Sequence, residues 1–299
     1  AAECGVSTDH THAVADPTMG TLHIVDADGA GPAPVYQRHH SAFCTSVRAD
    51  SFDWGALLGG GAKWLHLTGL TPLLGAGPRA AWDLAMQAAA KHPTLRTSLD
   101  LNHRPALGSL DELWAMVAPH LPALSLLILS EDSLRHLADR HGLAPPAGAT
   151  PGRAEQHAQQ RAALGALREA WGVPLLSCCF KRPLDGDPTP SDGAKDTLLG
   201  GRGVRRWSVV AFEGGDVSTE RDPTDHYPVE ALGGGDAWAG GFLAALSQSG
   251  VDLGGHTGDE ADGDAGRASA QAPTSSRALM LGPALSDACA RGDLLAAMS

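Results

Sequence analysis

Hydrophobic and polar positions are arranged in short runs over the first 45 residues of the chain. Two such runs, Thr21 to Asp26 and Ala33 to Arg38, flank the glycine-rich segment Asp28 to Gly31. Short runs on either side of a glycine-containing turn predict a β-hairpin, because glycine adopts the positive φ angles that tight hairpin turns require. We therefore expect residues 1–45 to form a small β lid.

The pattern changes near Lys63, from where short apolar runs alternate with longer segments of helical period. The expected strands are 64–67, 95–101, 124–129 and 174–180, and the expected helices are 79–91, 131–141 and 153–171. Such alternation predicts a parallel sheet covered by helices on both faces, with ligands bound at the carboxyl ends of its strands. Residues 46–299 are accordingly expected to form an α/β core.

Two long polar segments interrupt this core. Residues 183–203 and 250–276 are rich in Gly, Asp, Pro, Ser and Ala and contain few apolar side chains. Burial of so few apolar groups cannot offset the conformational entropy lost on ordering. Both segments are therefore expected to be low-complexity insertions on the surface.

Composition narrows the class of protein. The 299 residues are 43% hydrophobic, enough for one large core or two smaller ones. With 34 acidic and 22 basic residues the net charge is −12, which disfavours nucleic acid as a partner. No run approaches the roughly 20 uncharged apolar residues of a membrane helix, so no membrane partner is expected. The five cysteines lack metal-ligand spacing and make a poor disulfide framework, which favours a reducing, cytoplasmic location.

A glycine run near the C-terminal end carries the clearest chemistry. Gly233, Gly234 and Gly235 precede Asp236, and an apolar helical segment follows. Without Cβ atoms the run lets an anion approach backbone N–H groups, and the helix adds the positive end of its dipole. Asp236 then stands where a substrate hydroxyl would meet a phosphoryl group, and a carboxylate there is suited to accept the hydroxyl proton. The alternative is an ordinary loop before a buried helix that Asp236 caps.

Three blocks carry a resemblance to one family. The run Gly-Gly-Gly-Asp-Ala-Trp, 233 to 238, with Ala-Gly-Gly-Phe-Leu after it, resembles the C-terminal signature of the PfkB/ribokinase carbohydrate kinases. The block Asp100-Leu-Asn-His-Arg104 is similar to the Asp-x-Asn-x-Arg segment of that family, in the form typical of its 2-keto-3-deoxygluconate kinase branch. Tyr36-Gln-Arg38 is similar to the Tyr-x-Arg sugar-binding strand of the same branch, and the blocks occur in the family's order.

The resemblance implies a fold, an activity and a set of roles. It implies a ribokinase-like three-layer sandwich with a mostly parallel sheet and a small β lid. It implies an ATP-dependent kinase that uses Mg²⁺ and phosphorylates the terminal hydroxyl of a small sugar or sugar acid, with 2-keto-3-deoxygluconate as the best substrate. The implied roles are Asp236 as catalytic base; Gly233, Gly234 and Gly235 as anion hole; Tyr36, Arg38, Asn102 and Arg104 for substrate; Lys181 and Arg182 for nucleotide; and Glu230 for metal.

The residue types of the substrate set suit an acidic sugar. Tyr36 and Arg38 are two apart on a strand and so share a face, where a guanidinium binds a carboxylate and a phenol ring packs on carbon. The alternative is an exposed pair on a solvated sheet. Arg104 leaves the end of a buried strand and needs an anionic partner, which is either a substrate or a carboxylate such as Asp100.

Some positions depart from the family pattern. Glu230-Ala231 replaces Asp-Thr before the glycines, and Ser130 and Ser133 replace the ends of the Asn-x-x-Glu motif that helps to hold Mg²⁺. The chain also opens without an initiator methionine or the family's first strands. These departures leave open a non-catalytic kinase-like binding protein, or a kinase for a neutral sugar such as fructose or ribose. In the family, lids of two chains often pair, so a homodimer through the lid is expected.

Overall fold

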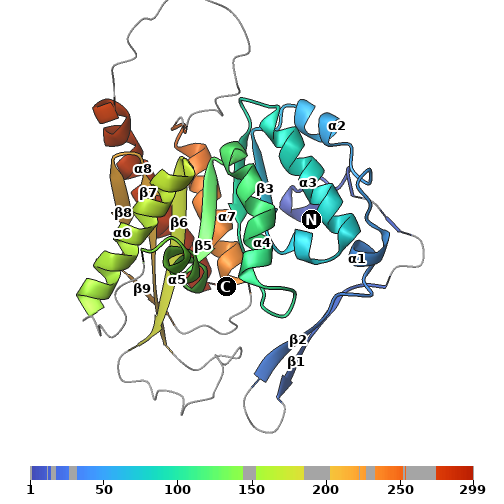
Figure 1. Ribbon diagram of the computed structural model, residues 1–299, viewed down its shortest axis with the longest axis horizontal. Coiled ribbons are helices and arrows are strands. Elements are labelled where there is room, and N and C mark those ends of the chain that lie inside the picture. Colours follow the sequence, from blue (N-terminus) through green and yellow to red (C-terminus); the bar gives the residue numbers. More distant parts are fainter. Residues whose placement is uncertain are drawn as a thin grey trace, which may run out of the picture.

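The computed structural model describes residues 2–11, 13–14, 18–26, 32–143, 153–184, 203–221, 223–226, 233–251, 253 and 274–298. Within these ranges the chain forms a two-stranded sheet and a seven-stranded sheet with helices on both faces (Figure 1). The predicted hairpin turn at 28–31 and most of the predicted insertions at 183–203 and 250–276 lie outside the described residues.

The predicted hairpin is confirmed. Strands β1 (Thr21–Asp26) and β2 (Pro32–Gln37) pair antiparallel, with Leu22 opposite Tyr36. The ribbon projects from the body (Figure 1) and forms a sheet of its own. A two-stranded ribbon is only marginally stable by itself in water, so this ribbon needs additional packing contacts to stay folded away from the core.

The main sheet has the order β3-β4-β5-β6-β7-β8, with β9 beside β7. Strands β3 to β6 run parallel, and β7 returns antiparallel to β6. The mostly parallel sheet is therefore confirmed, whereas the closing strands β7 to β9 were not anticipated. The strands are β3 (Trp64–Thr68), β4 (Arg96–Asp100), β5 (Leu126–Ser130), β6 (Leu175–Pro183), β7 (Val204–Phe212), β8 (Gly215–Ser218) and β9 (Thr224–His226).

Helices cover both faces of this sheet (Figure 1). The helices expected at 79–91, 131–141 and 153–171 are present as α3, α5 and α6 with small shifts of their ends, while α4 and α8 were not anticipated. The helices are α1 (Ala42–Ser46), α2 (Trp54–Gly59), α3 (Ala76–Ala90), α4 (Leu110–Val117), α5 (Glu131–Arg140), α6 (Arg153–Trp171), α7 (Gly234–Gln248) and α8 (Thr274–Met298), with 3₁₀ turns at Ala2–Cys4, Thr71–Leu73 and Ala118–Ala123.

The sheet separates two hydrophobic clusters, which makes the fold three-layered. One cluster packs α3 to α6 against strand residues such as Leu99, Leu127 and Phe180. The other packs α7 and α8 against strand residues such as Leu126 and Ile128. Because side chains alternate along a strand, neighbouring residues of one strand belong to different layers. Among the described residues, no helix has both the length and the apolar character needed to cross a bilayer.

Candidate active site

Helix α7 begins at the edge of the sheet where the parallel strands end. Gly233 precedes it with φ 77°, a left-handed conformation that glycine adopts without strain. Gly233 is also the N-cap residue, and no side chain makes a cap hydrogen bond there. Asp236 lies exposed in the first turn. It therefore does not act as the N-cap, and the backbone N–H groups of the first turn remain open to an anion.

Asp100, at the end of β4, lies near Asp236. The pKa of Asp100 is raised to about 6, chiefly by burial and in part by the negative charge of Asp236, while the backbone N–H of Asn102 and the charge of Arg104 oppose the shift. The N–H of Asn102 donates to Asp100 Oδ1 at 3.0 Å. The structure thus brings Asp236, predicted as base, close to the Asp-x-Asn-x-Arg segment.

Asn102 holds an unusual backbone conformation in this segment. Its φ is 43°, the only positive φ of a non-glycine residue in the described ranges, and its Nδ2 donates to Thr68 Oγ1 at 3.2 Å. The turn after β3 crosses close by, since a Cβ added to Gly69 would lie 2.4 Å from the carbonyl oxygen of Leu101. Conformations of this kind persist only where the surroundings hold them, and they gather at functional sites.

Arg104 is exposed, and its Nη1 donates to the carbonyl oxygen of His103 at 3.1 Å. Its charge acts on Asp100, yet the described contacts include no ion pair between the two. A guanidinium that is held by a neighbouring carbonyl at this edge can still bind an anion. Its substrate role stays a prediction.

The two predicted lid residues contact each other. The guanidinium carbon of Arg38 lies 3.7 Å from the centroid of the Tyr36 ring, so the side chains share one face of the ribbon as expected. No described contact joins either residue to Asp236 or to Arg104. Their role in substrate binding therefore stays a prediction.

The two predicted nucleotide residues face opposite layers. Arg182 follows Phe180 in the alternation of β6 and lies in the layer of α5 and α6, where it pairs with both carboxylate oxygens of Glu131, each at 2.5 Å. Its guanidinium also lies over the ring of Trp207, 5.6 Å from the centroid. Lys181 belongs to the other layer, on the side of α7. Only Lys181 is thus directed to the layer that contains Asp236.

Arg206 on β7 is a cation that the sequence analysis missed. It is the cross-strand partner of Lys181 and lies in the same layer. Its Nε is buried and has no hydrogen-bond partner. The alternation of side chains along Val204–Phe212 could have revealed it. Arg206 points to the same face of the sheet as Ser208 and Val210, and Trp207 points to the other face.

The described residues contain no cluster of three or more His, Cys, Asp or Glu side chains that could hold a metal ion. Ser130 caps α5, since its Oγ accepts from the N–H of Ser133 at 3.2 Å and donates to Ser133 Oγ at 3.0 Å. Glu131 is occupied by Arg182. Glu230, the predicted metal residue, lies outside the described residues.

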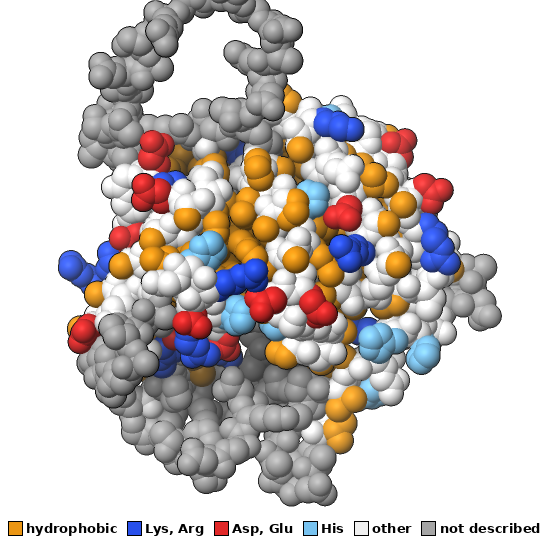
Figure 2. Space-filling view, in the orientation of Figure 1, with side chains coloured by type: hydrophobic (Ala, Val, Ile, Leu, Met, Phe, Trp, Pro, Cys, Tyr) orange, Lys and Arg blue, Asp and Glu red, His pale blue; other side chains and the backbone are white. Residues whose placement is uncertain are grey.

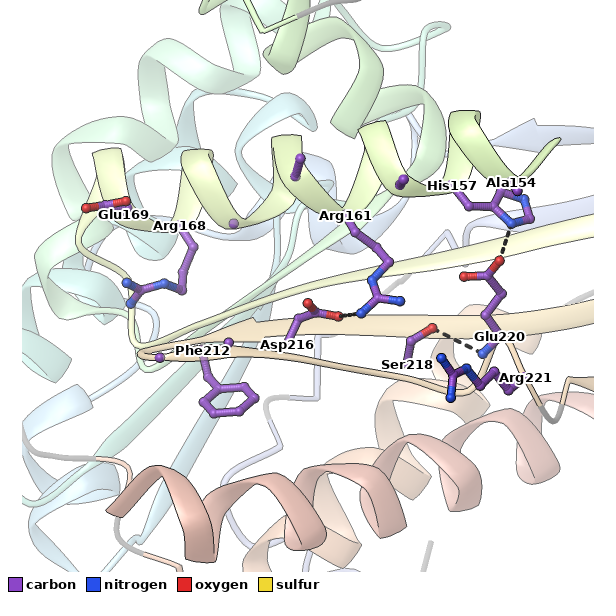
Figure 3. Close-up of a pocket in the computed structure, with 15 residues that line it drawn as sticks. Ala154, His157, Arg161, Arg168, Glu169, Phe212, Asp216, Ser218, Glu220 and Arg221 are labelled. Atoms are coloured by element: carbon purple, nitrogen blue, oxygen red, sulfur yellow. Dashed lines mark hydrogen bonds and ion pairs between the residues drawn. The ribbon is translucent and has the colours of Figure 1, made fainter. Parts of the chain in front are cut away.

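A hollow of about 900 Å³ lies between α6 and the β7–β8 hairpin (Figure 3). Ion pairs span it, between Arg161 and Asp216 at 2.7 Å and between His157 and Glu220 at 2.5 Å. It is on the opposite face of the sheet from α7 (Figure 3). Because it lies on the other side of the sheet from Asp236 and the glycine turn, it is not the candidate active site.

Charged side chains of both signs lie on the surface of the described residues (Figure 2). On the face seen in Figure 2, acidic and basic side chains of the described residues are interspersed. Neither sign gathers there into one extended patch. The active-site candidate is therefore defined by the glycine turn, Asp236 and Asp100, and not by a broad charged surface.

The chain thus folds as a three-layer α/β sandwich with a mostly parallel sheet, and a left-handed glycine precedes α7. No family model matches the chain. The structure of 2-dehydro-3-deoxygluconokinase from Thermotoga maritima is similar, with a TM-score of 0.57 and 22% sequence identity over 78% of this chain and 61% of that protein. The PfkB protein from Polaromonas sp. JS666 is similar with a TM-score of 0.57 and 18% identity, over 99% of this chain and 71% of that protein.

A third similar structure is fructokinase from Vibrio cholerae O395, solved with fructose, ADP and calcium. Its TM-score is 0.56 at 16% identity, over 99% of this chain and 71% of that protein. The structural neighbours are thus sugar kinases of the PfkB type, which confirms the expected fold. The chain spans about three fifths of the length of the 2-dehydro-3-deoxygluconokinase, so the activity and substrates of whole kinases enter only as proposals.

Proposed function

We propose that this chain forms the catalytic core of an ATP-dependent sugar kinase that phosphorylates the terminal hydroxyl of a small sugar acid, with 2-keto-3-deoxygluconate as the best candidate. The observation that carries the proposal is the left-handed Gly233 turn that opens α7, with Asp236 exposed in the first turn. The sugar kinases among the structural neighbours support it through the shared fold.

In this proposal Asp236 is the general base. Its carboxylate accepts the proton of the substrate hydroxyl while the hydroxyl oxygen forms a bond to the γ-phosphorus of ATP. The bond from that phosphorus to the bridging oxygen of ADP breaks, and ADP leaves with the electron pair. The N–H groups at Gly233, Gly234 and Gly235 and the positive end of α7 stabilise charge on the phosphoryl oxygens. Removal of a general base of this kind slows a reaction by about 10²- to 10⁴-fold.

The chain offers two cations for the phosphates of ATP. Lys181 and Arg206 are cross-strand partners in the layer of α7. Arg182, by contrast, is held by Glu131 in the other layer, so we assign it to structure. The described residues contain no cluster of three or more His, Cys, Asp or Glu side chains for Mg²⁺, which would neutralise charge on the phosphates when bound. Glu230 stays the candidate in this chain for holding it.

Arg104 supports an acidic substrate. It is exposed beside Asp100 at the edge where Asp236 lies, and a carboxylate bound to it would gain charge-assisted hydrogen bonds. Arg38, stacked on Tyr36, would add a second cation if the lid closes over the same edge. A kinase for a neutral sugar has no use for such a pair, and this distinction makes the substrate testable.

One observation favours a second candidate, a non-catalytic kinase-like binding protein. At the position of the family's Mg²⁺ motif, Ser130 and Ser133 bond to each other, and Glu131 is paired with Arg182. A protein that binds sugar and nucleotide would need the glycine turn but no carboxylate at this position. Turnover separates the two candidates.

The test uses the purified chain with ATP, Mg²⁺ and one of three sugars: 2-keto-3-deoxygluconate, fructose or ribose. ADP release is followed in a coupled assay, the sugar phosphate by ³¹P NMR and ADP binding by calorimetry. Turnover that depends on the sugar acid and is lost in Asp236→Asn supports the proposal. Binding of ADP without turnover of any sugar overturns it in favour of the binding protein. Equal turnover of all three sugars overturns the substrate assignment alone.

A further inference from the structure

A buried carboxylate on α8 joins three elements around the start of α7. Asp293 is 1% exposed and accepts three hydrogen bonds. Its Oδ2 accepts from Ser208 Oγ of β7 at 3.1 Å and from Thr219 Oγ1, after β8, at 2.5 Å. Its Oδ1 accepts from the indole N–H of Trp238 on α7 at 3.1 Å. The sheet, α7 and α8 therefore meet at one side chain.

Asp293 is well satisfied for a buried acid. Burial raises its pKa, while hydrogen bonds from Thr219 and Ser208, the charge of Arg206 and the bond from Trp238 oppose that shift. Three donors converge on a group with about four acceptor positions, so the network is nearly complete. Removing the acceptor would take away the described hydrogen-bond acceptor of the buried indole N–H of Trp238 and that of the Ser208 hydroxyl, whereas the Thr219 hydroxyl would keep its bond from the backbone N–H of Ser208.

Helices α7 and α8 approach each other closely at the same point. A Cβ added to Gly292 would lie 2.9 Å from the indole nitrogen of Trp238, and one added to Gly241 would lie 2.8 Å from Leu295 Cδ1. Trp238 is 1% exposed, and its ring stacks on Phe242 with centroids 4.8 Å apart. The indole is thus enclosed by α8 on one side and by its own helix on the other.

Trp238 is two residues from Asp236, in the turn of α7 that follows the glycines. The far end of the helix is held separately, because Arg96 Nη2 of β4 donates to the carbonyl oxygen of Val251 at 2.8 Å. Near its start, the helix is joined to α8 by the bond from Trp238 to Asp293. A phenylalanine at 238 would occupy similar space but could not donate a hydrogen bond.

We propose that Asp293 is a positioning residue. Through the indole of Trp238 it holds the first turn of α7, and with it the carboxylate of Asp236 and the N–H groups of the glycine turn, in register with the edge of the sheet. The role of Asp236 in this statement rests on the proposed kinase function. Small displacements of reacting groups reduce rates by up to about 10²-fold, so even one hydrogen bond at this place affects turnover.

The test compares two substitutions at the same carboxylate. Trp238→Phe removes the bond to α7, and Ser208→Ala removes a bond of equal length to β7. We expect Trp238→Phe to lower kcat about 10-fold with the KM for ATP within about twofold, and Ser208→Ala to leave kcat within about twofold. Asp293→Asn keeps an oxygen for the indole and should retain more kcat than Asp293→Leu. Equal kcat in Trp238→Phe and Ser208→Ala overturns the proposal.

A second readout does not depend on turnover. The N–H of Ala237 donates to the carbonyl oxygen of Gly233 at 2.8 Å, so its hydrogen exchange reports closure of the first turn. Exchange at 237–242 should rise about fivefold or more in Trp238→Phe and stay near wild type in Ser208→Ala. Unchanged exchange in Trp238→Phe overturns the positioning role. If the wild type has no turnover and exchange still rises, the kinase function fails while the positioning of α7 by Asp293 is supported.

Discussion

Asp100 and Asp236 place two carboxylates at one edge of the sheet, one at the end of β4 and one in the first turn of α7. The negative charge of Asp236 adds to burial in raising the pKa of Asp100 to about 6. Asp100 is therefore largely protonated in mildly acidic solution and largely charged above neutral pH. The charge of this edge, and hence its repulsion toward phosphate, changes in that range.

This relationship predicts a pH-dependent stability. The pKa of Asp100 is about 6 in the folded protein and near 3.8 in the unfolded chain. Between about pH 4 and 6 the folded state holds a proton that the unfolded chain has released, so the free energy of unfolding falls as pH rises through this window. Asp100→Asn removes the charged form. The variant should gain up to about 3 kcal/mol relative to wild type at pH 7.5 and little near pH 4.

Urea unfolding at the two pH values measures this difference. Asp132→Asn is the control, because Asp132 is an exposed carboxylate in the first turn of α5. Its unfolding curves should follow those of wild type at both pH values. A stability difference for Asp100→Asn that is the same at pH 4 and pH 7.5 would show that Asp100 keeps an ordinary pKa.

Asp236→Asn should abolish phosphoryl transfer and preserve nucleotide binding. An amide cannot accept the hydroxyl proton, so we expect a loss of about 10²- to 10⁴-fold in kcat. The anion site consists of backbone N–H groups, so the dissociation constant of ADP measured by calorimetry should change little. A decrease of less than tenfold would mean that Asp236 is not the base.

A readout without turnover accompanies that experiment. Removal of the negative charge at 236 should lower the pKa of Asp100, which carboxyl ¹³C NMR measures directly. Asp132→Asn again serves as the control and should leave that pKa unchanged. If Asp236→Asn also leaves it unchanged, the two carboxylates do not interact in solution.

Gly235 provides a prediction in which stability and activity change in opposite directions. No atom lies within 4 Å of a Cβ added at Gly235 or at Gly240, and both residues belong to α7. Alanine at either position should stabilise the helix by about 0.5 to 1 kcal/mol. Only Gly235→Ala places a methyl group where the phosphoryl oxygens would lie, so only this variant should lose activity. Thermal unfolding and kcat/KM check both parts, and an active Gly235→Ala would contradict the anion site.

Much of the fold could be predicted because its signals are local. The hairpin β1–β2, strands β3 to β6 and helix α6 follow from apolar periodicity within short windows. Strand β7 was missed because two arginines follow its first residue and because it pairs with β6 across a long insertion. Helix α8 was missed because it contains Pro283 and because its N-terminal part follows a polar segment, both of which are signals against a helix.

The candidate site was predictable only in part. Asp100 and Asp236 meet because parallel strands end at one edge, which the alternation of strands and helices indicates. The partner of Arg182 could not be foreseen, because Glu131 is far away in sequence and the layer that each residue of β6 faces depends on tertiary packing. Asp293 carries no motif. Its importance appears only when Ser208, Thr219 and Trp238 are brought around it.

The exposed apolar side chains of the lid predict that two copies of the protein pair. Leu22, Val25, Val35 and Tyr36 are between 39% and 46% exposed on a ribbon of two strands. Pairing with the lid of a second copy would cover these side chains and the open strand edges. We expect a homodimer at micromolar concentration by sedimentation equilibrium. Val35→Lys should weaken it about tenfold or more, whereas Leu84→Lys, which changes a similarly exposed residue on α3, should not. A monomer in the unsubstituted protein would contradict this assembly.

Arg104 decides between an acidic and a neutral substrate. Its exposed guanidinium lies near Asp100 at the candidate site, in a chain whose net charge is −12. A cation kept at this edge favours an anionic ligand. Each charge-assisted hydrogen bond to a carboxylate contributes roughly 1.5 to 3 kcal/mol, which corresponds to ~10- to 150-fold in affinity. Competition assays should therefore rank 2-keto-3-deoxygluconate above fructose and ribose.

Arg104→Met should remove most of that preference, because it deletes the charge and keeps an unbranched side chain of similar length. Arg135→Met is the matched control, since Arg135 is an exposed arginine on α5 that pairs with Asp132. It lowers the net charge by the same amount and should leave the ranking intact. If the two variants shift the ranking equally, the effect is one of overall charge. Equal affinity of the unsubstituted protein for acidic and neutral sugars would eliminate the sugar acid as substrate.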